Sequence, residues 1–337
     1  MSIRRLLIST ALTALASWLA SSPAQAGYTF QNIINPLDPT FNQELGINNS
    51  GVISGYFGIG GGVMGHPNQG YTYSGGVFSL TTNFPGSVQT QLTGLNNNGT
   101  VVGFWAPSNN RNDPNYGFYK QGATFTMVAN QSAATPQINQ LLGVNDSNVA
   151  VGFFNDAGGN AHGFTYNITT GTFSSPINDP LGVSTTAAGI NNAGDIVGFY
   201  STVPGGGANG FLDVGGTFTT LDAPGSTSTM LLGVNNKGLI VGTDTDANGM
   251  HGVIYNELTN SWTVLDDPNG IGTTTFNGLN DLGQIVGFYV DGNGNTIGLL
   301  ASAPAPEAGK GVLGLALLVL AGAAARARGV CWRADRA

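Results

Sequence analysis

The chain has 337 residues, a formal net charge of −8 and only 8% charged residues. Short runs of Val, Ile, Phe, Tyr and Thr between Gly- and Asn-rich turns indicate strands and exclude a helix-rich fold. The single cysteine, Cys331, lies near the C-terminus, so the central part of the chain has no disulfide, thiolate catalysis or thiolate metal site. Residues 27–303 carry three basic and sixteen acidic residues, a net charge of −13, which excludes a nucleic-acid binder because nothing would neutralise the phosphates.

Residues 1–26 have the pattern of a secretory signal peptide. Arg4 and Arg5 precede an apolar stretch at residues 6–20, and Ala24-Gln25-Ala26 forms a small-x-small cleavage site. An uncleaved anchor helix is the alternative, but the short apolar run and the cleavage site favour removal. We therefore expect an exported chain that begins at Gly27.

One phrase is repeated six times along the chain, with the consensus Gly-[Ile/Leu/Val]-Asn-[Asn/Asp]-x-Gly-x-[Ile/Val]-Val-Gly-[Phe/Tyr]. Its leading glycines are Gly46, Gly94, Gly143, Gly189, Gly233 and Gly278, which lie 44 to 49 residues apart. Self-similarity at this period is typical of a propeller or a solenoid.

Each repeat contains two hairpins and therefore four strands, which we call a to d. The Asn-Asx-x-Gly segment between strands a and b suits a type I turn closed by a left-handed residue, and Asn148 replaces the glycine in the third repeat because Asn tolerates that conformation. The second hairpin is clearest at residues 163–173 and 210–220. Four antiparallel strands per repeat make up a propeller blade.

The two ends of the array complement each other. The last repeat has strands a, b and c at residues 277–301 but no strand d, and residues 27–38 match the d-strand segment at residues 216–224. A solenoid would need capping repeats, whereas a ring needs this exchange. We predict an all-β, six-bladed β-propeller of four-stranded blades over residues 27–302, closed by the mature N-terminal strand, with five or seven blades as the alternatives.

The composition changes again after the repeats. Residues 303–310 form a Pro/Ala linker, residues 311–325 are apolar, and residues 326–337 contain four arginines. Fifteen helical residues span about 22 Å, which is short of the ~30 Å hydrocarbon core. We therefore expect a hydrophobic sorting or anchor segment that holds the chain at the membrane transiently.

The repeats resemble the HAF-repeat extracellular proteins of bacteria, and residues 191–200 and 161–166 carry the resemblance best. The tail resembles the PEP-CTERM sorting signals of Gram-negative envelopes, with Pro306-Glu307-Ala308 at the place of the Pro-Glu-Pro motif. These resemblances imply an envelope or extracellular location and a sorting protease or transpeptidase that acts on the tail. Neither family implies an activity for this chain.

The histidines do not form a catalytic set with nearby nucleophiles. His162 and His251 occupy equivalent positions before strand c of two different blades, so their side chains should point apart, and His66 lies in a long loop. We predict structural roles for all three and no catalytic residues.

Asp244-Thr245-Asp246-Ala247-Asn248-Gly249 begins like a calcium loop. An EF-hand loop would need Glu at its twelfth position, which is Tyr255 here. Turns rich in Asx and Gly also look like this without a metal. We predict no cofactor and no metal ligands, with calcium binding at Asp244, Asp246 and Asn248 as the alternative.

Aromatic residues end strand b in five of the six repeats. Because neighbouring residues of a strand face opposite sides of the sheet, at least one residue of each pair should pack between blades. A sugar-stacking site is the alternative. The residues are Tyr56, Phe57, Trp105, Phe153, Phe154, Phe199, Tyr200, Phe288 and Tyr289.

Strand direction sorts the connections onto two faces of the ring. The short a–b and c–d turns lie on one face, which we call the turn face. The b–c and d–a connections lie on the other face, which we call the loop face. Three of these connections are long, at residues 58–69, 106–115 and 201–208. Arg111 is the only basic residue of the loop face, which collects ten acids: Asp38, Asp113, Asp156, Asp179, Asp222, Asp244, Asp246, Asp266, Asp267 and Asp291. We expect a ligand to bind there and to be cationic, or a neutral sugar bridged by a divalent ion.

The sequence thus predicts an exported, non-enzymatic repeat protein of the cell envelope or exterior that binds or scaffolds a glycan or a protein, for example in a surface matrix. A glycan-acting enzyme or a calcium-dependent lectin on the same scaffold is the alternative. The prediction of a binding module rests on the sequence containing no nucleophile–base pair, phosphate loop or cofactor motif.

Overall fold

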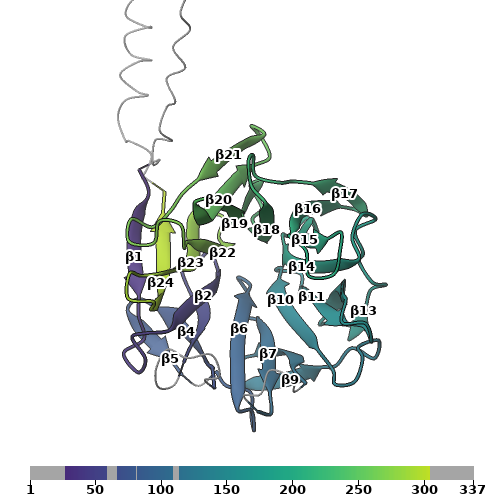
Figure 1. Ribbon diagram of the computed structural model, residues 1–337. Coiled ribbons are helices and arrows are strands. Elements are labelled where there is room, and N and C mark those ends of the chain that lie inside the picture. Colours follow the sequence, from purple (N-terminus) through teal and green to yellow (C-terminus); the bar gives the residue numbers. More distant parts are fainter. Residues whose placement is uncertain (1–26, 59–66, 81, 109–113, 304–337) are drawn as a thin grey trace, which may run out of the picture.

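The structure is a computed structural model that describes residues 27–58, 67–80, 82–108 and 114–303. These residues form six four-stranded antiparallel sheets arranged as blades around a central axis (Figure 1). The predicted six-bladed β-propeller is thereby confirmed. No helix among the described residues is long and apolar enough to cross a membrane. The predicted signal peptide and the predicted sorting segment lie outside the described residues.

Each blade places strand a at the axis and strand d at the rim. Blades 1 and 2 consist of β2 (Asn42–Ile47), β3 (Ile53–Phe57), β4 (Gln69–Ser74) and β5 (Val77–Ser79), and of β6 (Gln89–Leu95), β7 (Val101–Ala106), β8 (Tyr116–Gln121) and β9 (Thr124–Val128). Blades 3 and 4 consist of β10 (Asn139–Val144), β11 (Val149–Asn155), β12 (Ala161–Asn167) and β13 (Thr172–Phe173), and of β14 (Ser184–Ile190), β15 (Ile196–Ser201), β16 (Asn209–Val214) and β17 (Thr217–Thr220). Blades 5 and 6 consist of β18 (Ser228–Val234), β19 (Leu239–Asp246), β20 (Gly249–Asn256) and β21 (Ser261–Val264), and of β22 (Thr275–Leu279), β23 (Gln284–Val290), β24 (Thr296–Ser302) and β1 (Thr29–Ile33).

The N-terminal strand closes the ring, as the sequence predicts. β1 pairs antiparallel with β24, from Thr29 opposite Ser302 to Ile33 opposite Gly298. Ile33 is 2% exposed and packs with Ile47 of blade 1 and Val286 of blade 6. The first strand therefore joins the two ends of the chain both by backbone hydrogen bonds and by apolar packing.

The glycine in the middle of each strand b is required by a bulge in strand a. In every blade the register between the two strands shifts once, for example between Leu141 and Gly143 in blade 3. The shift brings the carbonyl oxygen of Gln140 so close to Gly152 that a Cβ atom on Gly152 would overlap it. Equivalent overlaps recur in the other five blades.

The leading glycine of each repeat lies where neighbouring inner strands approach one another. A Cβ on Gly46 would lie 2.9 Å from the Cα of Gly94, and a Cβ on Gly278 would lie 3.1 Å from the Cα of Gly46. The other four leading glycines make the same approach to the next blade. Only glycine leaves enough room for the six strands to meet around so narrow an axis.

The hydrophobic core is divided into layers between the blades. A large residue of strand a packs onto the glycine that opens strand c of the preceding blade: Leu92 onto Gly70, Leu141 onto Gly117. These residues are completely buried, and in every repeat a glycine near the start of strand c is followed by a buried Tyr, Phe, Val or Leu.

Glu44 is the exception in this set of core residues. It takes the place of Leu92 and packs onto Gly298 at the junction of blades 1 and 6, where it is completely buried. The Tyr71 hydroxyl donates a hydrogen bond to Glu44 Oε1, whereas Glu44 Oε2 has no partner. Burial raises the pKa of Glu44 well above its usual value, and the hydrogen bond from Tyr71 opposes this only in part. The carboxyl group is therefore protonated in the folded state over a wider pH range than in the unfolded chain.

A substitution of Glu44 should change how stability depends on pH. Because the folded pKa is raised, the stability contributed by the neutral carboxyl is fully present below the unfolded pKa, near 4.5, and is lost as pH rises toward the folded pKa. We expect Glu44→Gln, which cannot ionise, to gain in melting temperature over the native chain as pH rises from 5 to 8. Thermal melts at a series of pH values test this, and parallel profiles for the two proteins would show that Glu44 does not contribute.

Candidate functional site

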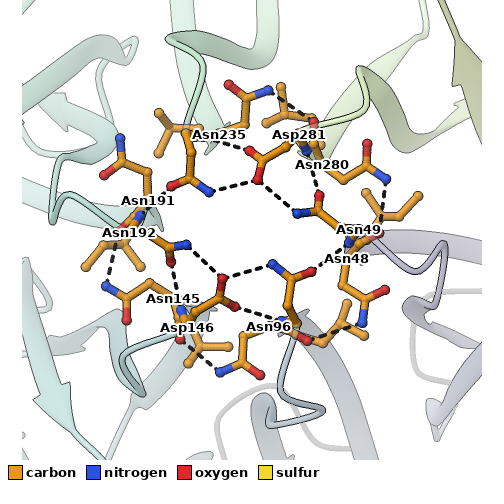
Figure 2. Close-up of a pocket in the computed structure, with 18 residues that line it drawn as sticks. Asn48, Asn49, Asn96, Asn145, Asp146, Asn191, Asn192, Asn235, Asn280 and Asp281 are labelled. Atoms are coloured by element: carbon orange, nitrogen blue, oxygen red, sulfur yellow. Dashed lines mark hydrogen bonds between the residues drawn. The ribbon is translucent and has the colours of Figure 1, made fainter.

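Twelve Asn and Asp side chains surround the axis on the turn face (Figure 2). The first Asn of the a–b turn has two roles in five of the six blades. Its side-chain oxygen accepts hydrogen bonds from two amides of its own turn, as Asn145 Oδ1 does from Ser147 and Val149 at 3.1 and 3.0 Å. Its amide group donates to the backbone of the next blade, as Asn96 Nδ2 does to the Asn145 carbonyl at 2.9 Å. The first Asn thus shapes the turn and connects two blades.

This connection is present at five of the six blade junctions. At the junction of blades 4 and 5, Asn191 Nδ2 donates instead to the carboxylate of Asp195 at 2.8 Å. Asp195 occupies a position that is apolar or neutral in the other repeats. Among the described residues of this turn, the hydrogen bond to blade 5 is consequently the one that the Asn192 amide donates to Asn236 Oδ1.

The second residues of the turns form a closed circle of hydrogen bonds. Each backbone amide donates to the side-chain Oδ1 of the second residue in the next blade, at distances of 2.8 or 2.9 Å. The members in order are Asn49, Asn97, Asp146, Asn192, Asn236 and Asp281. We call this set the axial circle.

The two carboxylates of the axial circle are matched by its amides. Asp146 Oδ2 accepts from the side chains of Asn97 and Asn192 at 2.9 and 2.7 Å, and Asp281 Oδ2 accepts from those of Asn49 and Asn236, both at 2.9 Å. Burial works to raise the pKa of Asp146 and Asp281, but these hydrogen bonds outweigh it and lower both. Because each Asp lies between two Asn residues, both carboxylates of the circle are satisfied within it.

The axis offers little space for a ligand. The cavity within the Asn and Asp side chains measures about 70 Å³, and the adjoining one between the inner strands about 80 Å³. Pockets for small organic ligands are commonly ~300–1,000 Å³. The hydrogen-bond network of the turn face thus holds the six blades in register.

On the loop face, most of the predicted acids are used by the protein itself. Asp113 and Arg111 lie outside the described residues. Of the nine acids that are described, eight accept a hydrogen bond from the backbone amide of another residue: Asp38, Asp156, Asp179, Asp222, Asp246, Asp266, Asp267 and Asp291. They shape loops, a role that the charge count alone does not reveal.

His162 and His251 do lie in separate blades, each with acids of its own blade. In blade 3, His162 Nε2 lies 3.1 Å from Asp156 Oδ2, and Nδ1 lies 2.8 Å from the neutral side chain of Asn178. The hydrogen bonds from His162 and Asn160 lower the pKa of Asp156 to about 2. His66 lies outside the described residues.

In blade 5, His251 has carboxylates on both sides. Its Nδ1 lies 2.7 Å from Asp266 Oδ2 and its Nε2 lies 3.3 Å from Asp246 Oδ1. Asp244 lies directly opposite His251 in the pairing of β19 with β20. We call Asp244, Asp246, His251 and Asp266 the blade 5 cluster.

The segment considered as a calcium loop is a tight hairpin. Asp244 and Asp246 belong to β19, Gly249 already begins β20, and Asp246 Oδ1 accepts the Asn248 amide at 2.6 Å. Within the described ranges, no three His, Cys, Asp or Glu side chains are placed to share a metal ion. Calcium binding there stays an untested alternative.

The aromatic residues that end strand b pack as expected. Phe57, Phe154, Tyr200 and Tyr289 are all at most 5% exposed. In blade 2, Trp105 stacks on Phe84, with ring centroids 4.6 Å apart. These rings serve the packing of the blades, which was the prediction favoured over a sugar-stacking site.

No family model and no curated protein sequence matches this chain. Among solved structures it is similar to a sialidase of Trypanosoma rangeli (TM-score 0.50, 11% identity, 82% of this chain and 59% of the sialidase). It is also similar to a prolyl endopeptidase (0.45, 12%, 77% and 39%) and to a chain of a nidogen/laminin complex (0.45, 11%, 73% and 85%). The chain therefore spans less than two thirds of the endopeptidase and of the sialidase. At these identities the similarity shows the propeller fold alone.

Proposed function

We propose that the protein is an exported, non-enzymatic binding or scaffold module of the cell envelope or exterior, and that it binds a glycan or protein partner through its loop face. The sorting protease or transpeptidase implied by the tail would act before or during its placement in the envelope. The observation that carries the proposal is the difference between the two faces of the ring. The polar side chains at the centre of the turn face bond to one another in the axial circle, whereas the loop face has long connections and accessible side chains.

The loop face has both a cavity and exposed apolar side chains. A cavity of about 280 Å³ opens on it at blade 1, lined by Leu37, Phe57, Gln69, Gly70, Leu80 and Asn83. Leu181 and Ile271, in two other d–a connections, are 65% and 74% exposed. Apolar side chains that are rimmed by polar loops are typical of surfaces that bind partners. These features support recognition on this face.

We predict that shortening the long b–c connections abolishes binding without unfolding the ring. The connection at residues 201–208 is largely exposed, so its replacement by the short turn at residues 291–295 should shift the melting temperature by less than about 2 °C. The same exchange would be made at residues 58–69 and 106–115. A screen against glycans, envelope proteins and cations, with native and exchanged chains side by side, measures the effect.

The matched control changes the turn face instead. Replacing the c–d turn at residues 257–260 by the two-glycine turn of blade 4 should leave every interaction found in the screen unchanged. Binding that survives the loop exchanges, or that is lost in this control, would show that the partner binds elsewhere. Turnover of a glycan by the native chain would contradict the non-enzymatic assignment.

A further inference from the structure

The loop-face end of blade 5 departs from the pattern of the other blades. Strand b ends there with Thr243 and Asp244, at the positions where the other repeats have aromatic residues. In those blades the second aromatic is Phe57, Trp105, Phe154, Tyr200 or Tyr289. A carboxylate costs far more to bury than an aromatic ring, so packing alone does not account for this exchange.

Asp244 is buried without a full set of partners. It is 5% exposed, and its Oδ1 accepts no hydrogen bond. Its position opposite His251, and two residues from Asp246 in the same strand, places all three side chains on one face of the sheet. Asp266 reaches the far side of the imidazole. The unpartnered oxygen therefore belongs to a cluster of three carboxylates around one imidazole.

Nothing among the described residues neutralises this cluster fully. Burial raises the pKa of Asp244. Burial also opposes the charge on His251, but Asp266, Asp246 and Asp244 together raise its pKa above the usual value. Three carboxyl groups thus surround a single imidazole. The basic side chains of the described part of the chain, Lys120 and Lys237, lie at turns of the opposite face.

The side chains of the cluster differ in how far they are exposed to solvent. Asp246 is the most accessible, with 31% of its side chain exposed, followed by Asp266 at 13% and His251 at 11%. Asp244 is the most buried acid of the cluster, at 5% exposed. Asp246 is therefore the acid that a small cationic group in solution would meet first, with Asp244 two residues away on the same face of β19.

We propose that the blade 5 cluster binds a primary ammonium group, whose N–H donors bond to Asp244 Oδ1 and to Asp246 on the same face of β19, while Asp266 holds the far side of the His251 ring. This inference rests on the proposed function, because it assigns a ligand chemistry to the same loop face. The ammonium group supplies the positive charge that the cluster lacks and a donor for Asp244 Oδ1. A free amino sugar and a lysine side chain share this chemistry.

In the test, n-butylammonium is added to the full chain. NMR of the histidine imidazoles and calorimetry measure its binding. Tetramethylammonium, which has the charge but no N–H donor, is the chemical control. We expect butylammonium to shift the His251 resonances and leave those of His162 in place. Glucosamine and Nα-acetyl-lysine amide then distinguish an amino sugar from a lysine side chain as the source.

Asp244→Asn should weaken butylammonium binding at least tenfold. Asp156→Asn is the matched control, because Asp156 contacts His162 Nε2 as Asp246 contacts His251 Nε2, whereas His162 otherwise lies against Phe154 and the neutral side chain of Asn178; this substitution should change nothing. If Asp244→Asn fails to fold, Asp246→Asn, at the exposed edge of the cluster, should give the same loss. Equal binding of tetramethylammonium, unchanged binding in the cluster variants, or a response to calcium or zinc but not to butylammonium would overturn the proposal.

The outcomes also separate this proposal from the proposed function. A partner that is lost on exchange of residues 201–208 but binds normally to Asp244→Asn would support the loop face as the binding face and show that this partner does not use the blade 5 cluster. Butylammonium binding without any partner in the screen would support the ammonium site and contradict the proposed binding function of the loop face.

Discussion

Removal of residues 27–35 is expected to open the ring and make the protein aggregate. The deletion removes all five residues of β1 and their pairing with β24. It also removes Ile33 from the apolar contact between blades 1 and 6. The exposed edge of β24 contains Leu299, Leu300 and Ala301, which favours pairing with another chain. Size-exclusion chromatography and thermal melts of the mature chain measure the result.

A peptide of residues 27–35 provides the control for this deletion. Added to the shortened chain, it should occupy the free edge of β24 and restore both the elution volume and part of the lost melting temperature. A scrambled peptide of the same composition should have no effect. If the shortened chain elutes and melts like the native one, β1 does not close the ring.

Replacement of Gly152 by alanine is expected to destabilise the protein strongly, as is the same change at the equivalent glycine of the other strands b. The added Cβ would overlap the backbone carbonyl oxygen of Gln140, and a backbone atom cannot be moved without disturbing the bulge at Leu141 and Gly143. We expect a loss of at least ~3 kcal/mol in the free energy of unfolding. For a domain of this size that corresponds to a melting temperature lower by roughly 6–12 °C.

Gly292→Ala is the matched control. Gly292 lies in the exposed b–c turn of blade 6, and a Cβ there meets no atom within 4 Å. The unfolding free energy should change by no more than about 0.5 kcal/mol. If the two substitutions were equally mild, the bulge would have to be free to rearrange, and the repeated glycine of strand b would need another explanation.

The sequence predicted the architecture well because its signals are local and repeated. Gly51 and Asn148 adopt the left-handed conformation expected at the end of the a–b turn, with φ of 72° and 58°. The unfinished last repeat and the match at residues 27–38 predicted the closing strand. A pattern of this kind depends on residues a few positions apart, so it can be interpreted before the fold is known.

The role of each polar residue was predicted less well. The repeated Asn-Asx pair was recognised as a turn, and its recurrence in all six repeats was the signal from which the axial circle could have been found. The ten loop-face acids were treated as one charged surface, whereas backbone amides occupy eight of the nine that the structure describes. Charge counts do not show which carboxylates a loop already uses.

By itself the sequence therefore determined the strands, the turns, the number of blades and the means of closure, since each follows from contacts within a repeat or between its two ends. The tertiary structure decided what the polar residues do. The axial circle joins residues 44 to 49 positions apart along the chain, and its last hydrogen bond, from Asp281 to Asn49, spans 232 positions. Such bonds form only when closure brings six turns to one axis. Asp244 likewise becomes distinct from the other acids only when β19, β20 and the loop carrying Asp266 surround it, because burial and the absence of a partner are properties of the packed blade.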